Sequence, residues 1–489
     1  MLDTPADQNA ALINTILAIA GAVLLTLYAV IRHFVKSSYT PKGCRILGLL
    51  TSQSNLHDEF QPEYSQGIPE NSIDEQGRPA WRVKALFTYP LKSCAGVELN
   101  EADVVATGFA FDRQFCFAEA EPCKDPKDGS IWVARTLRNR GFNKLALVRP
   151  EIWIPDQTAP GYNPELEGVK SRGVMVIHYP RVGRNSLHSA FIKAGIYFNV
   201  IPREASFAVP LHPPSFPNQQ STFPLTPVKI WKDNPLAYNY GHFIPSSFHR
   251  FLIPHEPGQS HGRQITLFRV NPSHTREIYR NAPRKQDLGF QPTTGFADAY
   301  PIHLLGLASV RDVNSHCEDD IQHLSIRRFR ANVIIQGPGA FVEDDWKVIR
   351  ISPPSSSSSS LEAAASPSSA TNANKSGEND TSGINTNEPN RSGSGLVIYT
   401  ACRTIRCKLP NVDPDTGFRH PREPDRTLKS YRRIDKGDLT NACLGMQGVP
   451  VVQGESALLF IALSNAHIEQ NPPSILFVLL SGSVLTVEL

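Results

Sequence analysis

The longest apolar run in the chain lies near its N-terminus. From Ala10 to Ile31 almost every residue is apolar, and only Asn14, Thr15 and Thr26 interrupt the run. A helix of about 20 residues spans a hydrocarbon core of roughly 30 Å. The pattern therefore predicts a transmembrane signal anchor over residues 10–31.

The charges that flank this run predict its orientation. Acidic Asp3 and Asp7 precede it, whereas Arg32, Lys36 and Lys42 follow it. Because basic flanks stay on the cytosolic side, the bulk of the chain is expected to face the cytosol. A cleaved signal peptide would place its positive charge first and is disfavoured, as is a buried helix without an amphipathic stripe. We expect a single-pass protein, and the mitochondrial outer membrane suits such an anchor.

Short stretches of alternating apolar and polar residues predict a mainly β protein with some α (α+β). Strands are expected over residues 81–87, 97–105, 115–118, 131–134, 145–148, 332–336, 346–351 and 396–399. A helix is predicted over Ile302 to His316, where leucines and valines recur at helical spacing.

Two polar segments interrupt this pattern. Residues 32–79 carry few apolar clusters and are predicted to form a linker. Residues 353–395 include a run of six serines and few large apolar side chains, so they cannot bury enough surface to offset the entropy of ordering. We predict a disordered insertion between two strands, where a long surface loop costs little.

Composition narrows the functional classes. The net charge of +3 over 489 residues and the absence of long basic runs give no indication of nucleic-acid binding. Eight cysteines lie scattered without a CxxC pair, which favours reduced thiols over a secreted disulfide scaffold.

Cys407 is the strongest candidate for chemistry. Arg403, Arg406 and Lys408 surround it in sequence, and cationic neighbours favour the thiolate. A thiolate can serve as a nucleophile or as a soft ligand for a transition metal. Nearby Cys402 is interpreted as a core strand residue.

Asp413 and Asp415 follow in the string Asp-Pro-Asp-Thr-Gly. They could form a general acid/base pair. The string is more typical of a turn in which aspartate accepts from backbone N–H groups, and we favour that interpretation.

Several motifs together resemble the MOSC-domain family, and within it the amidoxime-reducing molybdenum enzymes of the mitochondrial outer membrane. The resemblance is carried by Arg406-Cys407, residues 412–417, 427–432, 89–94, Gly108, Asp112-Arg113, 301–314, 328–332 and 343–346. It covers residues 81 to about 150 and 296 to about 454. The resemblance implies a MOSC N-terminal β-barrel module over 80–230 and a MOSC domain over 231–454, interrupted by residues 353–395.

The resemblance also implies a molybdenum cofactor, a phosphate-bearing pterin that holds the metal. Cys407 falls on the position of the metal ligand and is the expected catalytic residue. The cofactor-contacting positions fall on Lys92, Ser93, Arg113, Arg330, Asn332 and Arg406. Lysine and arginine suit an anionic phosphate, although each of these residues alone is unremarkable.

The implied function is reduction of small N-hydroxylated compounds with electrons from cytochrome b5 and its NADH-dependent reductase. One alternative is a sulfur-transfer or cofactor carrier, because MOSC modules also follow a pyridoxal-phosphate domain in cofactor sulfurases. Here an anchor, a linker and a β-module occupy that space, which weakens this alternative. A further alternative is an inactive membrane-anchored MOSC protein.

Two departures from the family pattern stand out. Ala299 and Tyr300 replace neighbouring hydroxyl residues, so Ala299 can offer only its backbone. Residues 455–489 form an atypical tail with two short apolar runs. They either supply strands or reflect a mispredicted gene end, and the sequence favours the second hypothesis because the resemblance stops abruptly.

Overall fold

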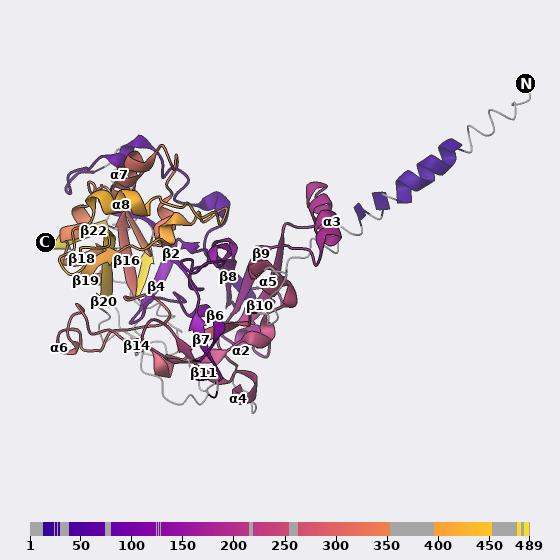
Figure 1. Cartoon of the computed structure of the whole chain (residues 1–489), viewed down its shortest axis with the longest axis horizontal. Coiled ribbons are helices and arrows are strands. Elements are labelled where there is room, and N and C mark those ends of the chain that lie inside the picture. The colour runs from indigo at the N-terminus through magenta and orange to yellow at the C-terminus, as the bar shows by residue number, and fades with distance from the viewer. Residues whose placement is uncertain are drawn as a thin grey trace, which may run out of the picture.

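The computed structural model describes residues 13–23, 25, 26, 28, 29, 39–73, 80–123, 125, 127, 129–214, 219–253, 263–352, 396–451, 477–480 and 484–488. Most of its regular structure is β-strand, with short helices between the strands (Figure 1). The predicted α+β class is confirmed.

The largest sheet closes on itself because its strands β2 and β17 also pair. In order, it contains β17 (Val333–Gln336), β16 (Ile302–Gly306), β20 (Cys443–Val451), β19 (Leu396–Ile405), β18 (Val348–Ser352), β22 (Val484–Glu488), β2 (Arg82–Thr88) and β3 (Val97–Leu99). Helices α7 (Leu307–Cys317) and α8 (Asp425–Tyr431) lie together at one end of this sheet (Figure 1). We call this sheet the ring sheet.

A second set of strands forms a closed barrel made of β11 (Leu225–Lys229), β12 (Leu236–Asn239), β13 (Ile265–Val270), β6 (Phe115–Pro122) and β7 (Ser130–Ala134). Beside it, a four-stranded sheet contains β1 (Cys44–Leu47), β8 (Arg149–Pro155), β9 (Val174–Pro180) and β10 (Glu204–Pro210). The barrel thus takes strands from residues 115–270, on both sides of the expected module boundary at 230.

The remaining elements are short. The strands are β4 (Glu101–Val105), β5 (Gly108–Phe109), β14 (Arg276–Glu277), β15 (Thr293–Thr294) and β21 (Phe477–Leu480). The α-helices are α2 (Glu167–Lys170), α3 (Ser186–Tyr197), α4 (Gln219–Thr222), α5 (Ser246–Leu252) and α6 (Lys285–Leu288). The 3-10 helices are η1 (Thr51–Gln53), η2 (Pro62–Ser65), η4 (Asn143–Leu147), η5 (Gly241–Phe243), η6 (Pro272–His274), η7 (Ile326–Phe329), η8 (Val342–Asp345) and η9 (Leu409–Asn411).

The two halves of the fold share one hydrophobic core. A single cluster of buried side chains contains Leu86 and Phe115 from the N-terminal half together with Leu304, Val333 and Ile398 from the C-terminal half. Apolar burial stabilises at roughly 25 cal/mol per Å². The two halves therefore pack on the same buried side chains.

Most strand predictions are confirmed, including those that correspond to β2, β6, β7, β17, β18 and β19. The strand over 145–148 is wrong, because residues 143–147 form η4, and an apolar run that short does not distinguish a strand from a helical turn. The helix over Ile302 to His316 is wrong at its start, where β16 runs. All five β16 residues are buried, so they show no alternation.

The polar segments have different outcomes. Within the predicted linker, β1 joins a sheet, and Leu56 and Glu59 are buried, so this part is folded onto the rest of the chain. The insertion 353–395 lies outside the described residues. Its flanking strands β18 and β19 pair antiparallel, as expected for a loop between neighbours.

The tail supplies two strands. β21 pairs with β4, and β22 pairs with β18 and touches β2 at the pair Arg82 and Val484. The first alternative, that the tail supplies strands, agrees with these pairings. The mispredicted gene end stays a hypothesis.

The predicted anchor lies partly outside the described residues, which omit 10–12, 24, 27, 30 and 31. Among the helices that the structure does describe, none combines the length and the hydrophobicity needed to cross a bilayer. The anchor is not supported by this finding.

Candidate functional site

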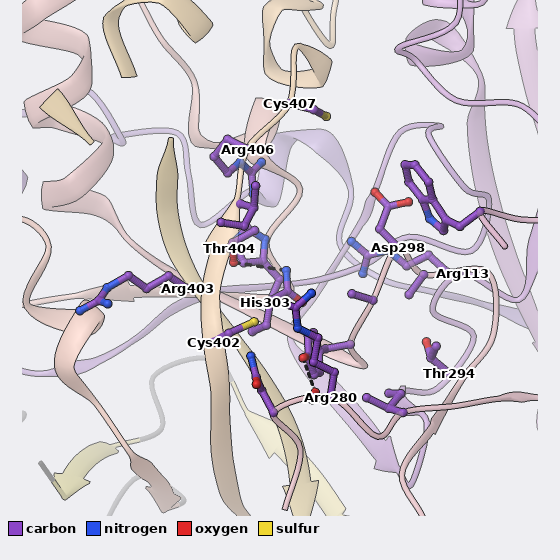
Figure 2. Close-up of a pocket in the computed structure, with 18 of the residues that line it drawn as sticks. Arg113, Arg280, Thr294, Asp298, His303, Cys402, Arg403, Thr404, Arg406 and Cys407 are labelled. Carbon is purple, nitrogen blue, oxygen red and sulfur yellow. Dashed lines mark hydrogen bonds between the residues drawn. The ribbon is translucent and has the colours of Figure 1, made fainter. Parts of the chain in front are cut away.

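One pocket of about 600 Å³ brings all the sequence-predicted site residues together. Those residues are Lys92, Ser93, Arg113, Arg330, Asn332, Arg406 and Cys407. They come from loops at the ends of the ring-sheet strands β2, β17 and β19 and from the loop before β6. Segments more than 300 positions apart in the chain thus meet at one place (Figure 2).

Three of the seven residues adopt a left-handed backbone conformation. The φ angles are 65° at Ser93, 48° at Arg113 and 58° at Arg330. Residues other than glycine enter this region at a cost of about 1–3 kcal/mol and persist there only where the surroundings enforce it. Such strain clusters at functional sites, which supports this pocket as one.

A hydrogen-bonded network fixes Arg113 and Asn332. The Nη1 of Arg113 donates to Asp112 Oδ2 at 2.5 Å and to Asn332 Oδ1 at 3.0 Å, and its Nη2 donates to the carbonyl of Arg330 at 3.0 Å. The Nδ2 of Asn332 donates to Asp112 Oδ1 at 3.0 Å. Buried Asp112 and Asn332 therefore orient the Arg113 guanidinium.

Arg406 is buried and Arg330 is partly buried, and both cations have incomplete partners. Arg330 donates to the carbonyl of Cys94, and Arg406 Nη2 donates to the carbonyl of Phe329 at 3.0 Å. Among the described residues, Nη2 of Arg330 and Nε of Arg406 have no hydrogen-bond partner. Burial lowers the pKa of both guanidinium groups, because it disfavours their charge. Both would be stabilised by an anion.

The aromatic ring of Tyr89 contacts two of the cationic side chains, Arg113 and Arg330. The guanidinium carbons of Arg113 and Arg330 lie 4.7 and 4.3 Å from the ring centroid of Tyr89. Tyr89 is buried, and its hydroxyl donates to the carbonyl of Ala331 at 3.2 Å. Cation–π contact partly compensates for bringing two like charges together.

Lys92 is buried at another wall of the pocket. Its Nζ donates to the carbonyl of Phe296 at 2.8 Å and to Asp298 Oδ1 at 2.5 Å. Burial lowers the pKa of Lys92, although Asp298 opposes the shift. Asp298 is exposed, and the adjacent Lys92 ammonium lowers the pKa of its carboxyl to about 2. The two groups form an ion pair at the pocket wall.

Cys407 is half-buried just after β19, next to Arg406 (Figure 2). The prediction that three cations surround it is wrong in part. Arg403 points away from Arg113 and Asp298 and pairs with Asp344 and Asp345 at 3.9 and 3.4 Å.

Three pocket residues were missed by the sequence predictions. His303 lies on β16 and is buried, and burial together with Arg406 and Arg113 lowers its pKa well below the ordinary range. Cys402 lines the same pocket instead of only the core, and Asp298 provides the partner of Lys92. The sequence predicted a helix at residues 302–306, and only a strand prediction there could have placed His303 at the pocket.

The two aspartates after the cysteine form a turn, as predicted. Asp413 Oδ1 accepts from the backbone N–H of Asp415 at 3.0 Å and of Thr416 at 2.8 Å. Its Oδ2 accepts from Arg328 at 2.6 Å, and Asp415 pairs with Arg327 at 2.6 Å. These contacts shape the loop, and neither aspartate lines the pocket.

The site offers few protein donors for a metal. In the part of the chain that the structure describes, no group of three or more His, Cys, Asp or Glu side chains could hold an ion. A metal at Cys407 would therefore need most of its ligands from a cofactor.

Comparison with known proteins identifies both domains. Residues 80–160 match the family described as "MOSC N-terminal beta barrel domain", and residues 291–379 match "MOSC domain". Mitochondrial amidoxime-reducing component 1 of Homo sapiens is 27% identical over 361 residues, which is 73% of each chain. The proteins of that name from Mus musculus and Danio rerio are 29% and 30% identical over 143 and 150 residues.

The alignments with the mouse and zebrafish proteins span only 29% and 32% of those proteins. The two matched domains nevertheless agree with the observed fold, and residues from both matched regions line the pocket. Residues 80–160 and 291–379 thus match the two MOSC domain models, and the chain is similar to the mitochondrial amidoxime-reducing components.

Proposed function

We propose that this chain is a molybdenum-cofactor-dependent oxidoreductase that reduces small N-hydroxylated compounds. The observation that carries the proposal is the pocket itself. It gathers eight Lys and Arg side chains and two half-buried thiols, Cys402 and Cys407, from segments that are distant in sequence. The names of the relatives give the reaction class, which is reduction of amidoximes.

The residues present fit an anionic pterin cofactor. Eight Lys and Arg side chains line the pocket against five Asp and Glu side chains, and in the described part of the chain only carbonyl acceptors are found for Arg330 and Arg406. Arg330 Nη2 and Arg406 Nε lack partners among the described residues and are free to donate to a phosphate. Charge-assisted bonds of this kind are the strong ones.

Each residue then has a defined role. Arg330 and Arg406 would bind the anionic part of the cofactor, and the Asp112–Asn332 network would orient Arg113 toward it. Cys407 would be the only protein ligand of the metal and the catalytic residue. When bound, the cofactor supplies two-electron oxygen-transfer chemistry.

The electron donor is part of the proposal. Cytochrome b5, fed by its NADH-dependent reductase, would dock where the pocket opens. The relatives' printed names place them in mitochondria, and we propose the same location for this chain. Membrane attachment through residues 10–31 stays a sequence-based prediction, and carbonate extraction of isolated mitochondria tests it.

Reconstitution tests the proposed reaction. The full chain, produced in cells that make the cofactor, is combined with cytochrome b5, its reductase and NADH, and benzamidoxime reduction is measured. We expect turnover that requires all three partners. Folded protein that contains molybdenum but gives no turnover would contradict the reductase and favour a cofactor carrier. Folded protein without molybdenum would contradict both.

A further inference from the structure

A solvent-exposed apolar helix projects from the body of the protein, far from the pocket. Helix α3 begins after Asn185, whose side chain accepts from the backbone N–H of His188 at 2.8 Å and caps it. It lies at the tip that joins β9 to β10, which pair antiparallel from Pro180 and Glu204 onward. Figure 1 shows α3 standing out at one end of the molecule.

The exposed face of α3 is strongly apolar. The exposed fractions are 74% for Leu187, 74% for Phe191, 84% for Tyr197 and 66% for Phe198. Leu187, Phe191 and Phe198 are spaced by four and seven residues, so they lie on one side of the helix, and Tyr197 flanks them. Three exposed aromatic side chains on a single short helix form a patch that points to an interaction surface.

The charge of this tip indicates what the patch meets. Residues 181–203 contain Arg181, Arg184, Lys193 and Arg203 and no Asp or Glu, which gives four positive charges and no negative ones. An apolar face with aromatic residues and a basic surround is the pattern of a helix that lies in a membrane interface. Basic residues near an anionic lipid surface are attracted to it electrostatically.

We propose that α3 docks on an anionic phospholipid surface, with Leu187, Phe191, Tyr197 and Phe198 inserted at the level of the headgroups. In Figure 1 the described part of the N-terminal apolar segment extends outward at the same end of the molecule as α3. The inference does not depend on the chemistry proposed for the pocket.

Photo-crosslinking tests this docking directly. The full chain is mixed with vesicles of phosphatidylcholine and phosphatidylserine that carry a diazirine phospholipid, and the labelled peptides are mapped. We expect label within residues 186–198, and at least several-fold less on vesicles of phosphatidylcholine alone. Because label is mapped by peptide, lipid contact by the N-terminal segment does not obscure the result.

A charged double variant provides the control. Leu187→Glu with Phe191→Glu is expected to abolish the α3 label, whereas Leu439→Glu, at an equally exposed leucine elsewhere, leaves it unchanged. The proposal is overturned if bound wild type shows no label on α3 or if neutral vesicles label α3 equally. Crosslinks between α3 helices of two copies without lipid would also overturn it, in favour of self-association.

Discussion

At the scale of single residues, the pocket holds strained backbone beside buried charge. Ser93, Arg113 and Arg330 occupy left-handed conformations, and Arg330 and Arg406 carry unmatched donors. Neither feature stabilises the fold by itself. Both are expected where a protein sacrifices stability to hold a ligand in one geometry.

Ser93→Gly separates strain from function. Glycine adopts the left-handed conformation without a steric cost, so we expect the free energy of unfolding of the apoprotein to rise by about 1 kcal/mol. Cofactor content is expected to fall, because the hydroxyl is lost and the loop loosens. Urea denaturation and molybdenum analysis measure the two effects. A variant that is less stable than wild type would show that the loop conformation is not strained.

At the scale of elements, the turn that positions Arg330 depends on a distant segment. Glu59 accepts from the Ser325 hydroxyl at 2.7 Å and from the Ile326 backbone N–H at 2.9 Å. Ser325 is the N-cap of η7, Ile326 is its first residue and Arg330 is its C-cap. The residues before position 80 thus support the pocket, although the family match starts at 80.

Substituting Glu59 tests this support. Glu59→Ala leaves two buried donors without an acceptor and is expected to cost roughly 1–3 kcal/mol of unfolding free energy and to lower cofactor content. Glu59→Gln keeps an acceptor and is expected to retain the cofactor. If Glu59→Ala retains cofactor as well as Glu59→Gln does, the positioning role is refuted.

Glu59 also predicts how the free energy of unfolding changes with pH. Burial raises the pKa of the Glu59 carboxyl, although its hydrogen bonds and Arg311 oppose the shift. Its ionisation therefore costs folding free energy, and stability is lost as pH rises from about 4.3, the unfolded value, through the folded value. Glu59→Gln cannot ionise, so its stability relative to wild type should rise over that window. Urea denaturation across the acidic range measures the difference in unfolding free energy between Glu59→Gln and wild type. A difference that falls as pH rises would contradict the prediction.

At the scale of the whole molecule, the C-terminal strand completes the ring sheet. β22 lies between β18 and β2, and its loss would leave two strands with unpaired backbone groups. The strands beside the insertion need no such help, because β18 and β19 pair directly. Stability is thus expected to depend on residues 477–488 and not on residues 354–394.

Two deletions compare these segments. Ending the chain at residue 476 is expected to lower the thermal midpoint markedly or to prevent folding. Replacing residues 354–394 with a short Gly-Ser turn shortens the closed loop and is expected to leave the midpoint unchanged or slightly raised. Thermal denaturation followed by circular dichroism gives both values. An unchanged midpoint after the first deletion would show that β22 is dispensable.

The sequence predicted the alternating strands and, through the resemblance, the members of the pocket. It failed at β16, where complete burial removes the alternation, and it left β22 open, because pairing there depends on an edge formed by distant strands. Asp298 and Glu59 could not be predicted either. Their partners, Lys92 and Ser325, are more than 200 positions away, so only the folded chain brings them together.

The ratio of bound molybdenum to protein tests the central claim most directly. We predict near-stoichiometric metal in wild type and in Cys402→Ser, whose thiol lines the same pocket, and a loss of at least several-fold in Cys407→Ser. Circular dichroism of each variant establishes that it is folded. Equal molybdenum in folded Cys407→Ser and wild type would contradict the role of Cys407 as the metal ligand.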